Sequence, residues 1–172
     1  EFDKHFVSHV ESHDFWELVY ADKGDLICSR DGHEEILKEG EVLFHKPGAV
    51  HALRADGKRA PNIFIISFEC KNEAIRFFED RHLIVDNSLR RFIFSIIEES
   101  KRTFDLPYSD PELKKMKLLE TPALGGQQLI KNYLELLLIN LMRNETEKSS
   151  SEAVFLPQEQ FDELISDQVI KY

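Results

Sequence analysis

The chain has 172 residues, of which 42% are hydrophobic and 31% charged, and this composition is typical of one globular domain with an appendage. Its net charge of -10 argues against binding of nucleic acid by this segment, because duplex binding depends on Lys and Arg neutralising phosphates. Cys28 and Cys70 lie far apart, which indicates neither a disulfide framework nor a metal motif. The sequence contains no signal peptide and no apolar run of the roughly 18 residues that a membrane span requires. We therefore expect a cytoplasmic protein without a membrane partner.

The first 70 residues predict short strands separated by turns. Residues 14–20 and 62–69 are rich in aromatic and β-branched side chains, and further strands are expected at 25–30, 34–38, 41–45 and 51–54. The Asp31-Gly32 pair between two of these segments is a hairpin signal. Strands at intervals of roughly ten residues favour a β-sandwich or a small barrel.

Beyond Cys70 the apolar period changes from that of a strand to that of a helix. Helices are expected at 72–80, at 87–104 with Asp86 or Asn87 as the N-cap, and at 127–144, with a proline-rich loop at 105–123. Residues 145–153 are polar and serine-rich, which is typical of a linker. A helical pattern returns at 158–172 and stops without a capping residue.

The helix expected at 127–144 is apolar over most of its circumference, so it needs cover on two sides. Two interpretations stay open: a central core helix, or a helix that packs on the barrel with one side and on a second subunit with the other. For the second interpretation, the residues expected at the dimer interface are Leu129, Tyr133, Leu134, Leu137, Leu138 and Leu141.

Imidazoles and carboxylates gather at residues 9–17 of the chain. If this segment is extended, its alternate residues share one face, and these are His9, Glu11, His13, Phe15, Glu17 and Val19. Such a mixed face fits a barrel interior that holds a ligand, and it also fits a solvent-facing sheet edge. Together with His51, these groups are suited to a divalent metal such as Zn, Mn, Fe or Ni. The alternative is that they pair with one another, with the backbone and with water.

The same residues resemble the two cupin motifs. Glu11-x-His13, three residues, Glu17, six residues and Gly24 is similar to the first motif, in which a histidine stands at the place of Glu11. Gly40, Pro47 and His51 resemble the second, although the spacing from Pro to His is one residue short. The resemblance implies a cupin-like β-barrel, or jelly roll, and places the metal positions at Glu11, His13, Glu17 and His51. The changed pattern is similar to that of regulatory cupins, where the metal site is often lost.

The order of motifs along nearly the whole chain resembles the N-terminal domain of bacterial AraC-type transcription regulators. The segment Gln128 to Leu138 is similar to the dimerisation helix of that family, and Asp167 to Tyr172 resembles the start of its DNA-binding domain. The resemblance implies an α+β chain with a barrel sensor at 1–70 and a helical dimerisation segment at 71–144. Residues 145–172 would then be a linker and the start of a helix-turn-helix domain that this chain lacks. A homodimer would sense a small molecule and contact DNA only through the missing domain.

Three further residues are candidates for the ligand site. Trp16 is suited to stacking on a sugar or aromatic ring, Arg54 to pairing with a ligand carboxylate, and His45 to lining the entrance. The residues expected to bind the ligand are therefore His9, Glu11, His13, Trp16, Glu17, His45, His51 and Arg54. We expect a sensor of a sugar or small acid, without catalysis and without a required cofactor. The alternative is a metal-dependent cupin enzyme, such as a dioxygenase, isomerase or epimerase.

Overall fold

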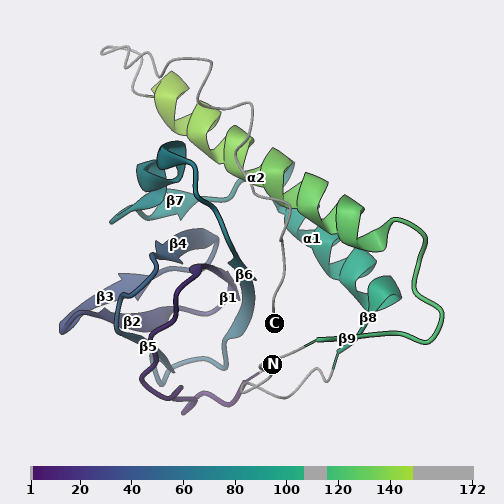
Figure 1. Ribbon diagram of the computed structural model, residues 1–172. Coiled ribbons are helices and arrows are strands. Elements are labelled where there is room, and N and C mark those ends of the chain that lie inside the picture. Colours follow the sequence, from purple (N-terminus) through teal and green to yellow (C-terminus); the bar gives the residue numbers. More distant parts are fainter. Residues whose placement is uncertain (1, 107–115, 149–172) are drawn as a thin grey trace. The chain divides into compact units, whose positions relative to one another are not determined.

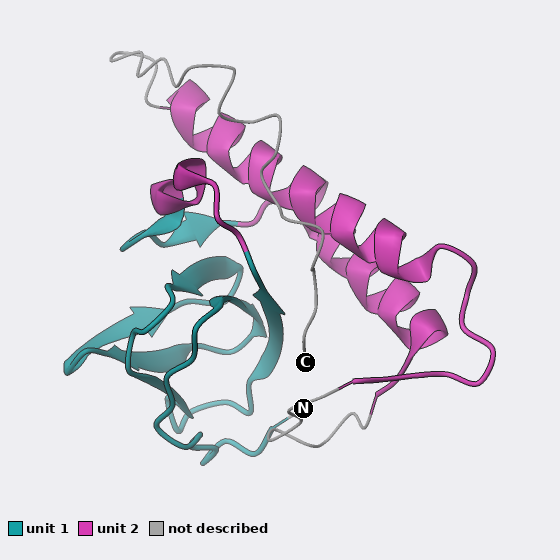
Figure 2. Ribbon diagram, viewed as in Figure 1, with its two compact units in different colours: residues 1–69, 78–84 teal, residues 70–77, 85–172 magenta. Residues whose placement is uncertain are grey.

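The computed structural model describes residues 2–106 and 116–148. The chain divides into two compact units (Figure 2), of which one contains residues 1–69 and 78–84 and the other residues 70–77 and 85–172. The expected boundary at residue 70 marks the first crossing between the units. A single boundary at this position does not describe how the chain returns to the first unit at residues 78–84.

The first unit consists of antiparallel strands in two sheets (Figure 1). One sheet has the order β6-β1-β4-β7 and the other the order β3-β2-β5. The strands are β1 (Trp16–Lys23), β2 (Leu26–Arg30), β3 (His33–Leu37), β4 (Glu41–His45), β5 (His51–Ala55), β6 (Asn62–Phe68) and β7 (Leu83–Ile84). The six longer strands lie where alternation and turn residues predict them, whereas the sequence gives no signal for the two-residue β7.

The hairpin between β2 and β3 follows from its turn residues. Asp31 and Gly32 have φ angles of 48° and 85°, so both occupy the left-handed region that a two-residue type I′ turn requires. Because Asp tolerates this region and Gly adopts it without strain, the pair fixes the register Arg30↔His33 through Leu26↔Leu37.

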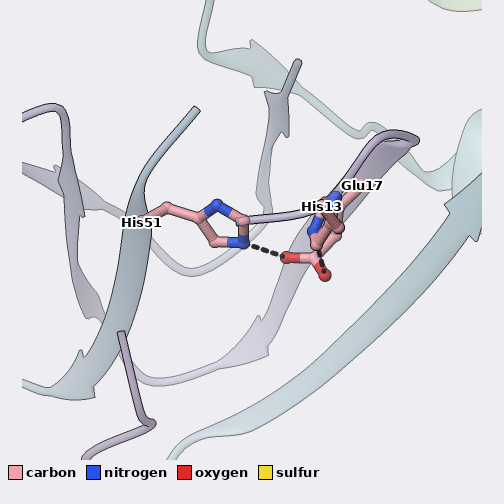
Figure 3. A group of neighbouring side chains, drawn as sticks. All are labelled: His13, Glu17 and His51. Carbon is pink, nitrogen blue, oxygen red and sulfur yellow. Dashed lines mark ion pairs between the residues drawn. The ribbon is translucent and has the colours of Figure 1, made fainter. Parts of the chain in front are cut away.

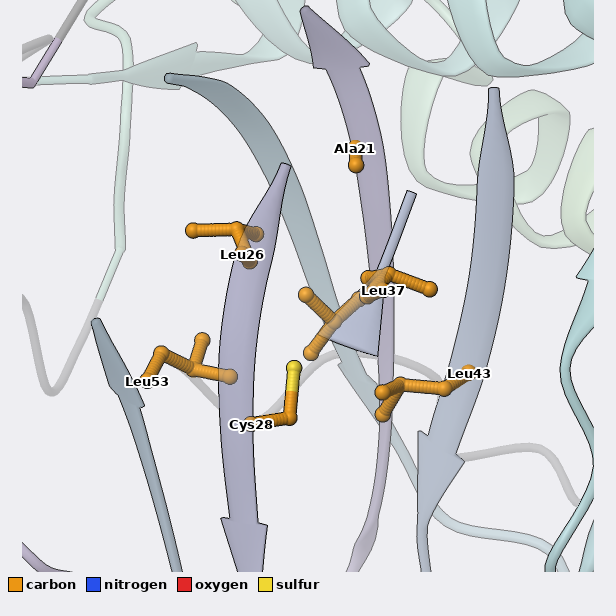
Figure 4. Close-up of a cluster of buried hydrophobic side chains, with 7 residues drawn as sticks. Ala21, Leu26, Cys28, Leu37, Leu43 and Leu53 are labelled. Carbon is orange, nitrogen blue, oxygen red and sulfur yellow. The ribbon is translucent and has the colours of Figure 1, made fainter. Parts of the chain in front are cut away.

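An apolar cluster fills the space between the two sheets (Figure 4). It joins buried side chains from both sheets: Val19, Ala21, Leu26, Cys28, Leu37, Leu43 and Leu53. These residues occupy alternate positions on their strands, so the inward face of each strand is apolar at this end of the barrel. Trp16 and Tyr20 are buried on the opposite face of β1.

The second unit is built on two helices that pack on each other, α1 (Asn87–Thr103) and α2 (Gly126–Lys148). Asp86 is the N-cap of α1, and its carboxylate accepts hydrogen bonds from the backbone N–H groups of Ser88 and Leu89. The helix expected at 72–80 is a 3₁₀ helix, η1 (Glu73–Phe78). The segment expected to be an irregular loop contains a small sheet of β8 (Phe104–Asp105) and β9 (Lys117–Leu118).

Most of the apolar surface of α2 is buried within a single copy of the chain. Four residues predicted for the dimer interface are fully or almost fully buried in a single copy: Leu134, Leu137, Leu138 and Leu141. These four side chains therefore pack inside a single copy, and their predicted part in a dimer interface stays a prediction. Leu129, which is 38% exposed, and the half-buried Tyr133 remain accessible, as does Leu136 at 43%.

The end of α2 also differs from the prediction. The helix continues through residues 145–148, which were expected to be linker, and Lys148 Nζ lies 2.7 Å from Glu145 Oε1 in the last turn. The rest of the predicted linker and the helix predicted at 158–172 lie outside the described residues. Within the described part of the chain, no helix combines the length and hydropathy that crossing a membrane requires.

Candidate functional site

His13, Glu17 and His51 come together in the first unit (Figure 3). His13 precedes β1, Glu17 lies on β1, and His51 begins β5. Each imidazole approaches one carboxylate oxygen: His13 Nε2 lies 3.5 Å from Glu17 Oε2, and His51 Nε2 lies 3.5 Å from Glu17 Oε1. One buried carboxylate is therefore held between two imidazoles.

A bend, and not strand alternation, brings His13 to Glu17. Four residues of extended chain span roughly 13 Å, too far for contact between the two side chains. Residues 12–15 are outside any strand, the chain bends at Asp14 and Phe15, and β1 begins only at Trp16. The continuous strand face considered for residues 9–19 therefore does not form.

Backbone carbonyls fix the orientation of both rings. His13 Nδ1 lies 2.9 Å from the carbonyl oxygen of Phe15, and His51 Nδ1 lies 3.0 Å from that of Ala49. Because a carbonyl oxygen can only accept, each Nδ1 carries the hydrogen. In the neutral rings, each Nε2 therefore presents a lone pair toward Glu17. Both Nε2 atoms and Glu17 Oε1 are buried, and none of the three has a hydrogen bond to any described residue.

The charges of Glu17 and His51 depend on each other. Burial by itself would raise the pKa of the Glu17 carboxyl, but the imidazoles of His13 and His51 outweigh it and lower that pKa to about 2. Burial disfavours the charged form of His51, yet Glu17, the Ala49 carbonyl and Glu11 together outweigh burial and raise the pKa of the ring. The site is therefore an anionic centre that attracts a proton or another cation.

His45 is the third imidazole of the barrel interior. It is fully buried, stacks on His51 with ring centroids 4.0 Å apart, and lies opposite Glu17 in the β1–β4 register. Burial, followed by the proximity of His51, lowers the pKa of His45 to about 3, so its ring is neutral. Neither ring nitrogen has a hydrogen-bond partner in the part of the chain that the structure describes, and a buried polar group left in this state is costly.

Polar and apolar layers follow each other along the same strand faces. Glu17 is two residues from Val19 on β1, and His45 is two residues from Leu43 on β4. His51 stands in the same relation to Leu53 on β5. Since side chains two residues apart share a face, the histidine–glutamate layer lies directly against the apolar cluster. The interior therefore has an apolar layer at one end and a polar layer at the other.

The three residues fit a divalent metal ion. Their ligand atoms all lie within 4.8 Å of one another. Metal–ligand bonds of about 2.0–2.1 Å in tetrahedral geometry place ligand atoms roughly 3.4 Å apart, close to the two 3.5 Å separations around Glu17. The Nδ1 contacts to backbone carbonyls are the outer hydrogen bonds that usually orient metal-binding histidines. The residues present are therefore suited to a metal.

Several predicted residues lie outside this group. Glu11 pairs with His51 through a backbone bridge, but its carboxylate is half exposed and lies 3.9 Å from His51 Nε2. His9 is exposed. Trp16 lies on the opposite face of β1 from Glu17, and Arg54 lies on the opposite face of β5 from His51. Arg54 pairs there with Glu34, 3.1 Å away.

A second polar group lies on the inward faces, around Arg30 and Glu35. Arg30 lies opposite His51 in the β2–β5 register, and its guanidinium is 3.2 Å from the carboxylate of Glu35. His82 Nε2 lies 2.9 Å from the other oxygen of Glu35. The sequence pattern could have revealed this group, because Arg30 and Glu35 each lie two residues from a buried residue of the same strand, Cys28 and Leu37, and therefore share its face.

Comparison with known proteins gives one family match. The family model described as AraC-like ligand binding domain matches residues 2–106. No curated protein matches the chain.

Three solved structures are similar to this chain over part of their length. An RmlC-like cupin from Shewanella frigidimarina NCIMB 400 is 25% identical, with 37% of this chain and 55% of that chain covered and a TM-score of 0.33. A cupin 2 conserved barrel domain protein from Rhodopseudomonas palustris is 18% identical, with coverages of 54% and 59% and a TM-score of 0.36. Apo ToxT K231A from Vibrio cholerae strain SCE256 is 10% identical, with coverages of 90% and 56% and a TM-score of 0.39. The chain thus matches little more than half the length of each of these structures. The predicted α+β fold, a small β-barrel of two sheets followed by helices, is confirmed by the strands and helices of the chain itself.

Proposed function

The chain belongs to the AraC-like ligand-binding domain family, and we propose that its barrel binds a small-molecule effector at His13, Glu17, His45 and His51. In this proposal the chain is the sensing part of a transcription regulator and carries out no reaction. A DNA-binding domain outside this sequence would act on the promoter, because the net charge of -10 is unsuited to contacting phosphates.

The single observation that supports this proposal is the set of buried polar atoms without partners at one end of the interior. Among the described residues, neither ring nitrogen of His45 has a hydrogen-bond partner, and the Nε2 atoms of His13 and His51 face the carboxylate of Glu17, 3.5 Å away and without a hydrogen bond. Buried polar groups are normally paired with protein, water or ligand. A ligand that supplied these hydrogen bonds would be bound strongly for the same reason.

The chemistry of the cluster narrows the class of effector. In the neutral rings, His13 and His51 present acceptors, and the carboxylate of Glu17 also only accepts. A ligand that donates hydrogen bonds, such as a sugar with several hydroxyl groups, fits this arrangement. A free carboxylic acid would place a second anion beside Glu17. Of the two classes expected from the sequence, the sugar is therefore favoured.

A thermal-shift screen tests this proposal. Neutral sugars and small carboxylic acids are compared on the wild type, Glu17→Gln and the exposed control Glu34→Gln. Because a ligand that binds the native state raises Tm, we expect stabilisation by a hydroxyl-rich compound in the wild type and in Glu34→Gln. In Glu17→Gln the stabilisation should be lost. Stabilisation only by acids, or an equal shift in Glu17→Gln, contradicts the proposal.

The metal-ligand geometry supports a second candidate, a metal-dependent enzyme of the cupin type. A divalent ion held by His13, Glu17 and His51 would supply Lewis-acid chemistry beside His45. Metal analysis of the purified protein before and after chelation separates the two candidates. Stoichiometric Fe or Mn that is lost in His51→Ala favours the enzyme, whereas the absence of a stoichiometric metal favours the sensor.

We further propose that the protein acts as a homodimer through the part of α2 that remains exposed. Leu129, Tyr133 and Leu136 follow each other at spacings of four and three residues, which places them on one stripe of the helix. Leu136→Glu should shift a dimer to monomer on size-exclusion chromatography with light scattering. Gln128→Glu, at an exposed polar position of the same helix, is the matched control. A dimer that survives Leu136→Glu together with Leu129→Glu contradicts this interface.

A further inference from the structure

Residues 78–84, called the return segment here, connect the two units of the chain. The chain leaves the barrel unit after residue 69, returns to it at 78–84, and enters the helical unit again at residue 85 (Figure 2). The return segment ends in β7, which pairs with β4 through Glu41↔Ile84 and Val42↔Leu83. Two residues beyond β7, Asp86 caps α1. The return segment is thus joined to the N-cap of α1 through Val85 alone.

The return segment contacts β4 on both sides of the buried His45. The Phe78 ring packs on Phe44, the residue before His45, with ring centroids 4.3 Å apart. Glu79 pairs with Lys46, the residue after His45, with 3.6 Å between Nζ and Oε2. A displacement of His45 would therefore change both contacts.

A second connection runs from His51 through Arg30. Arg30 lies opposite His51 on the neighbouring strand, and its guanidinium lies 3.1 Å from Asp80 Oδ1 in the return segment. The same guanidinium group pairs with Glu35, whose other oxygen accepts a hydrogen bond from His82. Arg30 is mostly buried while Asp80 is largely exposed, so the pair joins the barrel interior to the surface of this segment.

Asp80 is also held in an uncommon backbone conformation. Its φ angle is 57°, a left-handed value that residues other than glycine seldom adopt, although Asp tolerates it better than most. Such a conformation persists when surrounding contacts hold it, and it is a natural point at which a segment changes its path. The ion pair with Arg30 is one of those contacts.

We infer that the return segment transmits the state of the interior site to the start of α1, and that the Asp80–Arg30 pair is the contact through which it does so. The inference rests on the proposed function, since it concerns regulation by the same site. An occupant that shifts His51 or His45 alters the strands that hold Arg30, Phe44 and Lys46. The return segment then favours a second arrangement, and a small difference in free energy is enough to shift the population.

Amide hydrogen exchange on the whole 172-residue chain tests this inference without a ligand. Glu17→Gln is the perturbation of the site, because it removes the charge between the two imidazoles and keeps the side-chain shape. In the wild-type background we expect Glu17→Gln to change exchange at residues 85–92 by about threefold or more, along with exchange at 42–54. In the Asp80→Gly background the change at 42–54 should remain and the change at 85–92 should fall, because the pair with Arg30 is lost. Glycine suits the positive φ at this position.

Two control backgrounds complete the experiment. Asp80→Asn keeps the backbone preference and weakens the pair, so the response at 85–92 should fall between those of the wild type and Asp80→Gly. Glu34→Gln removes only the surface pair with Arg54 and should leave the response intact. An unchanged 85–92 response to Glu17→Gln in the wild type, or a full response in Asp80→Gly, overturns the inference. Either result leaves the thermal-shift test of effector binding unaffected, so the two failures are distinguishable.

Discussion

Replacing His45 by Gln should flatten the pH dependence of folding stability on the acid side. The His45 ring has a pKa of about 3 in the folded chain, mainly because burial disfavours its charged form, against 6.5 for an ordinary histidine. Between these two values the unfolded state binds a proton that the folded state does not. The stability associated with His45 is therefore present above pH 6.5 and is lost as the pH falls toward 3.

The size of this effect follows from one proton. A difference of one bound proton changes the free energy of unfolding by about 1.4 kcal/mol per pH unit. Between pH 6 and pH 4, His45 should contribute a loss of roughly 2 to 3 kcal/mol in the wild type, and Gln at this position should contribute none. Urea denaturation at pH 4, 5, 6 and 7 measures this difference.

His51 and Glu17 act in other pH windows. The raised pKa of His51 gives stability that is present at low pH and lost as the pH rises above 6.5 through the folded value. The pKa of Glu17, about 2 against 4.5, gives stability that is lost only as the pH falls below 4.5. His33→Gln, which makes the same substitution at an exposed position, is the matched control. Equal slopes for the wild type and His45→Gln between pH 6 and 5 would refute the reasoning.

Three further predictions concern the packing of each unit. Cys28 is fully buried, and burial, followed by the charge of Glu35, raises the pKa of its thiol to about 12. Ellman's reagent should therefore modify at most one thiol per chain before denaturation and two afterwards. Gly126→Ala would place a methyl group against the side chain of Thr103 where α2 meets α1. This variant should lower the free energy of unfolding by about 1–3 kcal/mol, measured by urea denaturation, whereas Gln127→Ala at an exposed position should change it little. Asp86→Ala removes the N-cap of α1 and should lower the free energy of unfolding by about 1 kcal/mol, whereas Asp86→Asn should retain most of the stability. Equal losses in both variants would exclude the capping role.

The regular elements are predictable because their signals are local. Alternation predicts β1 to β6, Asp31-Gly32 predicts the hairpin, and Asp86 is recognisable as an N-cap. Each of these signals lies within a few residues of the structure that it determines.

Features that depend on distant contacts are harder to predict. The two-residue β7 exists because it pairs with β4, about forty residues earlier in the chain, and two residues carry no periodicity. In α2 the apolar residues surround most of the helix, so the pattern does not say which face packs on α1. For that reason the predicted dimer interface included residues that are buried within the chain.

The candidate site was predicted by composition more than by geometry. The cluster of His and Glu at residues 9–17 predicts a polar site that includes His13 and Glu17, but an unbroken strand would have kept these two side chains apart. The bend at Asp14 and Phe15 joins them, and alternation cannot reveal it. Arg30 and Glu35 were readable from strand parity, although an arginine and a glutamate near a hairpin are ordinarily solvent-exposed.

Calorimetric titration of the best compound from the thermal-shift screen tests the central claim most directly, because it measures whether binding depends on the buried carboxylate. The wild type and Glu34→Gln should bind this compound with the same Kd, and Glu17→Gln should weaken the binding by roughly tenfold or more, as expected for the loss of a hydrogen bond to a charged group. An unchanged Kd in Glu17→Gln would mean that the effector binds elsewhere and would contradict the account.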